Sequence, residues 1–140
     1  MAGRKVLAIA ALVGVLVAGG GTALRADALP GGLVGAWTTT IPDCARLFTR
    51  RGGNLAYRQP VDKFAQAAII GPQTIYLPSS TCHIQRVTHA NDSVKLSADC
   101  QDSISYTSQS VEIKVRSNSE IVYSPTGDPT LDTTFIKCPL

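Results

Sequence analysis

The residues of this chain with the most reactive side chains are four cysteines, Cys44, Cys82, Cys100 and Cys138. A cysteine nucleophile needs a free thiolate beside a base, and a thioredoxin-like centre needs a C-x-x-C motif, which the sequence lacks. All four lie beyond an apolar N-terminal leader, and an even number of cysteines in a short exported domain is typical of disulfide bonds. We therefore expect two disulfides and no catalytic thiol.

Other catalytic signatures are also missing from the sequence. It contains no G-x-S-x-G, no H-E-x-x-H, no phosphate-binding loop and no dinucleotide fingerprint. His83 and His89 would lie about 20 Å apart on one strand, which is too far to share a metal ion. The sequence therefore predicts a protein that is not an enzyme and has no cofactor or metal site.

The N-terminus has the features of an export signal. Arg4 and Lys5 precede the uncharged apolar run of residues 6–18, and Ala26-Asp27-Ala28 has the small-x-small pattern of a signal peptidase site. We predict a signal peptide over residues 1–28 and one mature domain over residues 29–140, in the periplasm or secreted. The alternative is an uncleaved helix over residues 6–24 that anchors the domain in the inner membrane, facing the periplasm.

The charge of the chain disfavours nucleic-acid binding. The formal net charge is +3, and removal of the leader would take away three of the basic residues and one acidic residue. The one basic cluster flanks a Gly-Gly turn and consists of Arg46, Arg50, Arg51 and Arg58. We predict a solvated loop there, with an interaction loop for phosphate or anionic lipid as the alternative.

The second half of the chain has the period of β-strands. Residues 111–116 alternate strictly between apolar and charged side chains, and residues 94–100 repeat the pattern. Further short strands are expected to begin at Ile104, at Ile121 and at Ile136, separated by turn residues. We therefore predict a mainly β fold, a small antiparallel barrel or sandwich, preceded by the hydrophobic leader helix.

The strand register suggests how the cysteines pair. If Thr88 and Val94 flank a turn centred on Asn91, Cys82 lies directly opposite Cys100, at a separation close to that of a disulfide. Cys44 and Cys138 would then form the second bond, although two other connectivities are formally open. The same register places His83 opposite Asp99 on the outer face.

The first half is less regular. Residues 42–48 fit either one helical turn or a strand that runs into a hairpin at Gly52-Gly53. Residues 64–70 fit a helix or a strand, and the following Gly71-Pro72 and residues 74–77 favour a β-hairpin.

Several of these residues together resemble a known group. They are Cys44 with Leu47-Phe48, the turn Arg50-Arg51-Gly52, Ile69-Ile70-Gly71 with Ile75, Cys82-x-Ile84, Cys100, and the terminal run from Phe135 to Pro139. At these positions the chain resembles small exported proteins of rhizobial-type α-proteobacteria. The resemblance implies that the protein is exported, and it implies no mechanism. Gly35-x-Trp37 also resembles the opening of lipocalins, avidins and small periplasmic protease-inhibitor barrels, where the tryptophan packs at the bottom of a barrel.

The leading functional prediction is a non-catalytic periplasmic or secreted module that binds a protein, a glycan or a small apolar ligand. An exposed apolar patch would identify its site, with candidate aromatic residues Phe48, Tyr57, Phe64, Tyr76 and Tyr123. One alternative is a membrane-anchored accessory subunit of an inner-membrane complex. Another is a periplasmic enzyme inhibitor that inserts residues 50–58 or 125–129 into a cleft.

Overall fold

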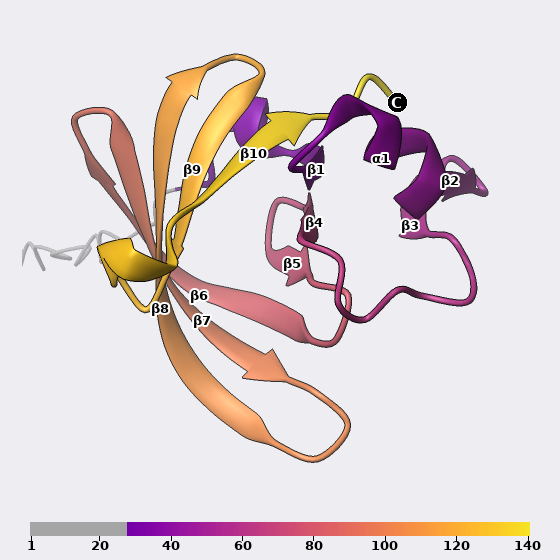
Figure 1. Cartoon of the computed structure of the whole chain (residues 1–140). Coiled ribbons are helices and arrows are strands. Elements are labelled where there is room, and N and C mark those ends of the chain that lie inside the picture. Colours follow the sequence, from indigo (N-terminus) through magenta and orange to yellow (C-terminus); the bar gives the residue numbers. More distant parts are fainter. Residues whose placement is uncertain (1–27) are drawn as a thin grey trace, which may run out of the picture.

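The computed structural model describes residues 28–140 and contains one closed β-barrel (Figure 1). Its barrel strands are β1 (Gly35–Thr38), β4 (Ala67–Ile70), β5 (Thr74–Tyr76), β6 (Thr81–Ala90), β7 (Ser93–Gln101), β8 (Tyr106–Ser117), β9 (Glu120–Pro125) and β10 (Thr133–Lys137). A helix α1 (Ile41–Leu47) and a two-stranded sheet of β2 (Phe48–Arg51) and β3 (Asn54–Tyr57) lie between β1 and β4 in sequence. Two 3₁₀ turns complete the described part, η1 (Gly31–Leu33) and η2 (Pro129–Leu131).

The barrel is an antiparallel meander. Going round it, β1 is followed by β4, β5, β6, β7, β8, β9 and β10, and every neighbouring pair is antiparallel. The turns β4–β5, β6–β7 and β8–β9 therefore share one end with η1, and the turns β5–β6, β7–β8 and β9–β10 share the other. This confirms the predicted mainly β fold with two disulfides and decides for the barrel over the sandwich.

The barrel interior is filled by side chains, as eight-stranded barrels of this size allow. The largest fully buried side chains of this core are Trp37, Ile70, Ile75, Val111, Ile113 and Ile121. The strand alternation that predicted the core in residues 94–100 is confirmed, since Val94, Leu96, Ala98 and Cys100 are buried.

The end of the barrel that carries η1 is closed by Trp37. Its indole N–H donates a hydrogen bond of 2.8 Å to the carbonyl of Leu33, and Leu33 is buried beside it. The ammonium of Lys137 lies 5.4 Å from the centre of the tryptophan ring and donates to the carbonyl of Gly32 at 2.8 Å. Gly35 has φ of +150°, a backbone conformation that residues with a side chain rarely adopt, so this position favours glycine.

A second, smaller core lies on the outer side of the barrel wall. Ala36 of β1 and Ala67 and Ile69 of β4 alternate with inward-facing residues, yet they too are buried. Leu47 and Phe48 cover them from α1 and β2. We call α1, β2 and β3 together the covering layer (residues 41–57); it lies against one side of the barrel in Figure 1.

Both predicted disulfides are present. Cys82 pairs with Cys100, and the two lie directly opposite each other on β6 and β7; Cys44 pairs with Cys138 across 94 residues. The predicted pairing of His83 with Asp99 is also confirmed as strand register. No ion pair between them is found within residues 28–140, and the Asp99 carboxylate accepts a hydrogen bond from the Ser108 hydroxyl instead, at 2.6 Å.

The predicted turn position was wrong by one residue. Val94 lies opposite His89, not Thr88, and Ala90 lies opposite Ser93. A β-bulge between Ile84 and Arg86 takes up the extra residue, so the register at the cysteines is restored. Asn91 adopts φ of 50°, which fits its place in the tight turn.

The first half combines both structures that its sequence allowed. Residues 41–47 form α1, and β2 then runs into the Gly52-Gly53 turn. The hairpin predicted around Gly71-Pro72 is confirmed as β4 and β5, whereas residues 64–66 are in neither helix nor strand. Ile104 was expected to begin a strand but lies in the β7–β8 turn, and β8 begins at Tyr106.

The predictions for residues 1–28 fall almost wholly outside the described residues. The signal peptide, the alternative anchor over residues 6–24 and the leader helix belong there. Within residues 28–140, no helix is both long enough and apolar enough to cross a membrane.

Candidate binding cleft

A cleft of about 690 Å³ lies between the covering layer and the barrel wall. One side is bordered by the consecutive residues 53–57 of the β2–β3 hairpin, and the other by Ile69, Ile70 and Gly71. Val34, Val61 and Tyr76 add further apolar surface, and the side chains of Arg51, Asn54 and Gln59 supply its polar groups. A cleft of this size and composition is in the usual range for ligand sites.

The cleft runs along the edge of β3. Successive side chains of a strand point to opposite faces, so a cleft bordered by every residue of 53–57 faces the edge of the strand. β3 pairs only with β2. Its other edge is thus unpaired within the described chain.

The hydrogen-bond pattern shows which backbone groups are free. The N–H of Arg58 donates to the carbonyl of Leu47 at 2.8 Å, and closely bonded pairs alternate with non-bonded pairs along an antiparallel ladder. Leu55, opposite Arg50, and Tyr57, opposite Phe48, therefore direct their N–H and C=O groups away from β2. These groups have no partner in the part of the chain that the structure describes.

Tyr57 joins the covering layer to the barrel beside the cleft. Its hydroxyl donates a hydrogen bond of 2.8 Å to the carbonyl of Tyr76, and its ring lies 5.3 Å from the ring of Phe48. Burial raises the pKa of the Tyr57 phenol well above its ordinary value, so the hydroxyl stays a neutral donor throughout the physiological pH range. The cleft therefore has a fixed inner wall.

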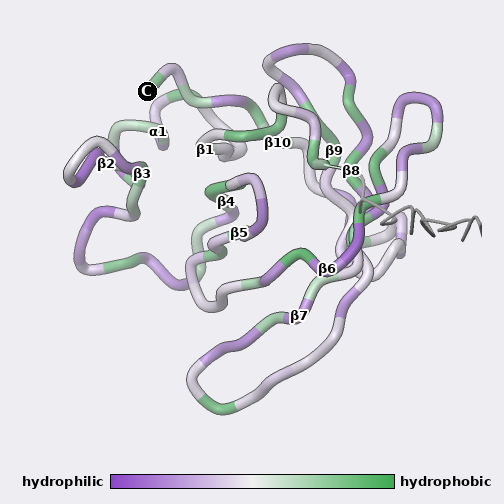
Figure 2. The backbone as a smooth tube through the Cα atoms, turned by 180° about the vertical axis from the view of Figure 1, so that it is seen from behind, coloured by the Kyte–Doolittle hydropathy of each residue, from purple (hydrophilic) through white to green (hydrophobic). Residues whose placement is uncertain are grey.

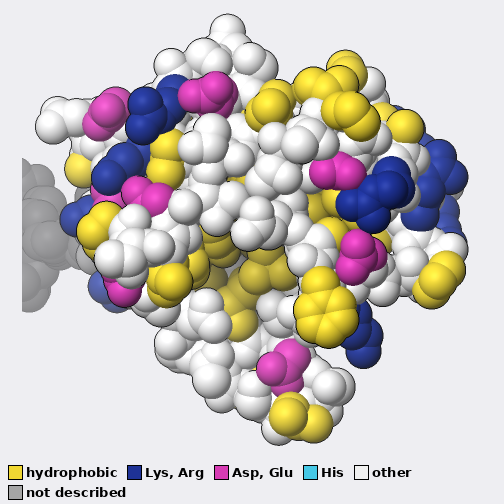
Figure 3. Space-filling view, viewed as in Figure 1, with side chains coloured by type: hydrophobic (Ala, Val, Ile, Leu, Met, Phe, Trp, Pro, Cys, Tyr) yellow, Lys and Arg dark blue, Asp and Glu magenta, His cyan; other side chains and the backbone are white. Residues whose placement is uncertain are grey.

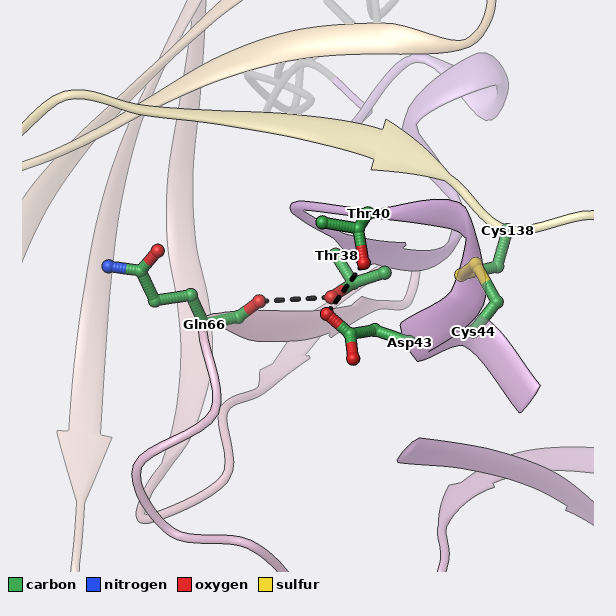
Figure 4. The surroundings of a disulfide bond; sticks show 6 residues. All are labelled: Thr38, Thr40, Asp43, Cys44, Gln66 and Cys138. Atoms are coloured by element: carbon green, nitrogen blue, oxygen red, sulfur yellow. Dashed lines mark hydrogen bonds between the residues drawn. A yellow bond between two sulfur atoms is a disulfide. The ribbon is translucent and has the colours of Figure 1, made fainter. Parts of the chain in front are cut away.

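The disulfide Cys44–Cys138 fixes the covering layer from the other side (Figure 4). It joins α1 to the segment directly after β10, where the N–H of Cys138 donates to the carbonyl of Ala36. The Thr38 hydroxyl donates to the carbonyl of Gln66 at 3.2 Å, and the Thr40 hydroxyl donates to the Asp43 carboxylate at 2.7 Å. The disulfide at Cys44 and the Tyr57 hydrogen bond to Tyr76 thus tie the two ends of the layer to the barrel.

Three of the four arginines predicted as a loop cluster hold the covering layer together. Arg46 forms ion pairs with Asp43 at 2.9 Å and Asp62 at 3.3 Å. Arg50 donates to the carbonyls of Gly53 and Leu140, and Arg58 donates to that of Ala45. Lys and Arg side chains gather over this part of the molecule in Figure 3.

Arg51 differs from the other three. It is exposed and borders the cleft, and its guanidinium makes no hydrogen bond or ion pair with any residue of 28–140. Its charge is therefore available to an acidic group bound in the cleft.

The candidate aromatic residues are divided by the structure. Phe48 and Tyr123 are buried, Tyr57 is half-buried at the cleft, and Tyr76 borders it with 47% of its surface exposed. Phe64 is 96% exposed in the loop before β4. The 125–129 loop, which was proposed for insertion, lies between β9 and η2 and makes only local hydrogen bonds among the described residues.

The sequence did not identify Leu55, Val61 or Ile69 as site residues. One signal was present: β4 consists of four consecutive apolar residues, all buried, where a one-sided barrel strand would alternate. Such a run indicates cover on both faces, and Ile69 and Ile70 line the cleft between the barrel wall and that cover.

Two further observations bear on the chemistry of the site. Within residues 28–140 the structure brings together no group of three metal-ligating side chains, and all four cysteines are in disulfides. The two disulfides are typical of proteins in an oxidising, extracytoplasmic environment. Comparison of the chain with protein-family models, with curated proteins and with solved structures finds no match.

Proposed function

We propose that this protein is a non-catalytic binding module of the periplasm or the extracellular space, and that β3 takes up an extended segment of a partner protein as an additional strand. The observation that carries this proposal is the unpaired edge of β3 inside an apolar cleft. Strand addition supplies affinity through main-chain hydrogen bonds and specificity through pockets for alternate side chains.

The backbone of β3 offers up to four hydrogen bonds to such a segment. They come from the N–H and C=O groups of Leu55 and Tyr57, which point away from β2. With a rise of about 3.3 Å per residue, the length of β3 matches four or five residues of an added strand. An apolar small molecule would fill the cleft but leave these backbone groups without partners, so a peptide satisfies the site more completely.

The lining indicates the side chains that the segment carries. Leu55, Val61 and Ile69 present apolar surface to every second residue of an added strand. Arg51, the last residue of β2, lies opposite Asn54 at the turn end of β3. It favours a carboxylate at that end of the cleft, from Asp, Glu or a chain terminus. We therefore expect an alternating apolar segment with one acidic group and no proline in its middle.

A random octapeptide library displayed on phage tests the proposal. We expect selection on the immobilised protein to enrich alternating apolar peptides with an acidic residue. Arg51→Ser is expected to weaken their binding about tenfold, equivalent to about 1.4 kcal/mol. Enrichment of no sequence pattern, or of peptides insensitive to Arg51→Ser and to every substitution in the cleft, would contradict the proposal.

A matched pair of substitutions isolates the backbone contribution. Leu55→Pro removes the side chain and the free N–H but no hydrogen bond to β2, whereas Leu55→Ala shortens the side chain and keeps the N–H. Binding of a selected peptide is expected to be at least tenfold weaker in Leu55→Pro than in Leu55→Ala. Equal affinities in two folded variants would show that the edge is not used.

A further inference from the structure

The distal part of the β7–β8 hairpin, residues 98–110, extends past the end of β9 (Figure 1), while Ala98 and Cys100 on its inner face belong to the barrel core. We call this part the arm. β9 pairs with β8 only from Val111 onward, so among residues 28–140 the segment 106–110 pairs with β7 alone. The disulfide Cys82–Cys100 joins the β7 part of the arm to β6, near the tip of the arm.

The tip of the arm is held in one conformation by Asp102. One oxygen of its carboxylate accepts from the N–H groups of Ile104 at 2.8 Å and Ser105 at 2.7 Å, and the other accepts from the Ser105 hydroxyl at 2.9 Å. Ile104 itself is 94% exposed. The arm therefore presents an apolar side chain on an ordered turn, and the backbone tube in Figure 2 is coloured hydrophobic at the tip of this hairpin.

The free edge of the arm offers backbone hydrogen-bonding groups. The N–H of Asp102 bonds to the carbonyl of Ser105, and that of Val115 bonds to the carbonyl of Asp92. By the alternation of an antiparallel ladder, Tyr106 and Ser108 direct their N–H and C=O groups away from β7. No described residue pairs with these groups, and both residues are exposed.

The composition of this edge distinguishes it from a protected one. Exposed edge strands usually carry lysine, proline or another charge that opposes pairing. Residues 103–111 have no charged residue and no proline. Two copies of the edge can therefore approach each other without repulsion between like charges.

We infer that two copies of this chain associate through their arms, with the edges of residues 106–110 paired antiparallel around a two-fold axis. An antiparallel edge is its own complement, which is the requirement of a symmetric dimer. This pairing also carries Ile104 of one copy toward the β9–β10 loop of the other, where Leu131 is 52% exposed. The inference does not depend on the function proposed for the cleft.

The dimer is expected to be weak. Only a few backbone hydrogen bonds and two apolar side chains from each copy, Ile104 and Leu131, become buried, which belongs to the smallest class of specific interfaces. A dissociation constant on the order of 100 µM follows. Association would therefore matter where the local concentration is high.

Sedimentation equilibrium between about 10 µM and 1 mM tests the inference with three variants. The weight-average mass of the natural sequence is expected to rise toward twice the monomer value, and that of Ser108→Pro to stay at the monomer value. Ser108→Ala is the matched control, since it also loses the hydroxyl bond to Asp99 but keeps the edge N–H. Ile104→Ser is expected to raise the dissociation constant about tenfold.

A monomeric natural protein at 1 mM, or a Ser108→Pro variant that dimerises like Ser108→Ala, would overturn the inference. If Ser108→Pro does not fold, amide hydrogen exchange in the natural sequence decides. The amides of Tyr106 and Ser108 are expected to exchange more slowly at 1 mM than at 10 µM, and equal rates would overturn the inference. Leu55→Pro, which alters the cleft, is expected to leave the mass at every concentration unchanged.

Discussion

The covering layer and the arm are built from the same parts and differ in what surrounds them. Each contains a strand with one unpaired edge, β3 or the first residues of β8, and each is crosslinked by one disulfide. The edge of β3 borders a cleft with Ile69 and Val61, whereas the edge at Tyr106 and Ser108 projects into solvent.

This difference separates two kinds of recognition. A recessed edge can select a partner by its side chains, because the walls of the cleft contact them. A projecting edge contacts mainly the partner's backbone, so any compatible edge suffices, including that of a second copy of the chain. The same unpaired strand thus supports selective binding in one place and self-association in the other.

Removing the two disulfides one at a time should give the largest effects on stability. On the chain-entropy model, Cys44→Ser with Cys138→Ser lowers the free energy of unfolding by about 4.5 kcal/mol, and Cys82→Ser with Cys100→Ser by about 3 kcal/mol. The difference arises because the sequence separations are 94 and 18 residues. Urea unfolding followed by circular dichroism measures both values.

The two double variants also separate the regions by function. Loss of Cys44–Cys138 should abolish peptide binding at the cleft and leave self-association through the arm. If the variant that lacks the Cys82–Cys100 disulfide is as stable as the natural sequence, the role of that bond in holding β6 to β7 is contradicted.

Truncation of one apolar side chain in each region should affect the stability very unequally. Phe48 in the covering layer is 1% exposed, and Phe48→Ala is expected to cost about 3–5 kcal/mol because a large cavity replaces the ring. Ile104 in the arm is 94% exposed, and Ile104→Ser is expected to change the stability by less than about 0.5 kcal/mol. Thermal unfolding at low protein concentration checks both, and a large cost for Ile104→Ser would show that the tip packs within its own chain.

The smallest expected effects come from the lowered pKa of one carboxylate in each region. The backbone N–H of Ile104 and the groups of Ser105 hold the pKa of Asp102 below its ordinary value, and the Thr40 hydroxyl followed by Arg46 does the same for Asp43. Because each pKa is lower in the folded state, each contributes stability above its unfolded pKa of about 3.9. That contribution is lost as the pH falls through the folded pKa.

Carboxyl chemical shifts in an NMR titration measure both groups. Ser105→Ala removes one donor to Asp102 and is expected to raise the pKa of Asp102 while leaving that of Asp43 unchanged. The protection of the Ile104 and Ser105 amides, measured against their intrinsic exchange rates at each pH, should fall below the folded pKa of Asp102. Titration of Asp102 at its ordinary value would contradict the ordered tip.

The sequence predicts the barrel better than it predicts the cleft, for a physical reason. Strand alternation in residues 94–100 and 111–116 is local, and it led to a barrel or sandwich and to Cys82 opposite Cys100. The turn was misplaced because a bulge at Gln85 has no marked local signal beyond an irregular pattern around Val87. The misplaced turn and the missed bulge each shifted the predicted register by one residue, in opposite directions. The predicted register was therefore right at the cysteines.

The cleft depends on contacts that no local pattern encodes. Leu55 and Ile69 face the same cleft only because the covering layer folds back over β1 and β4, and Cys138 holds it there from the far end of the chain. Arg51 could not be distinguished from Arg46, Arg50 and Arg58 in sequence, since only the structure shows which of them already have partners.

The most direct test of the central claim is amide hydrogen exchange at β3, followed by NMR with a peptide selected from the octapeptide library. If the peptide adds to the edge of β3, the amides of Leu55 and Tyr57 should exchange at least tenfold more slowly in its presence, while those of Tyr106 and Ser108 stay unchanged. A peptide that binds and leaves the exchange of Leu55 and Tyr57 unaltered would contradict strand addition at this cleft.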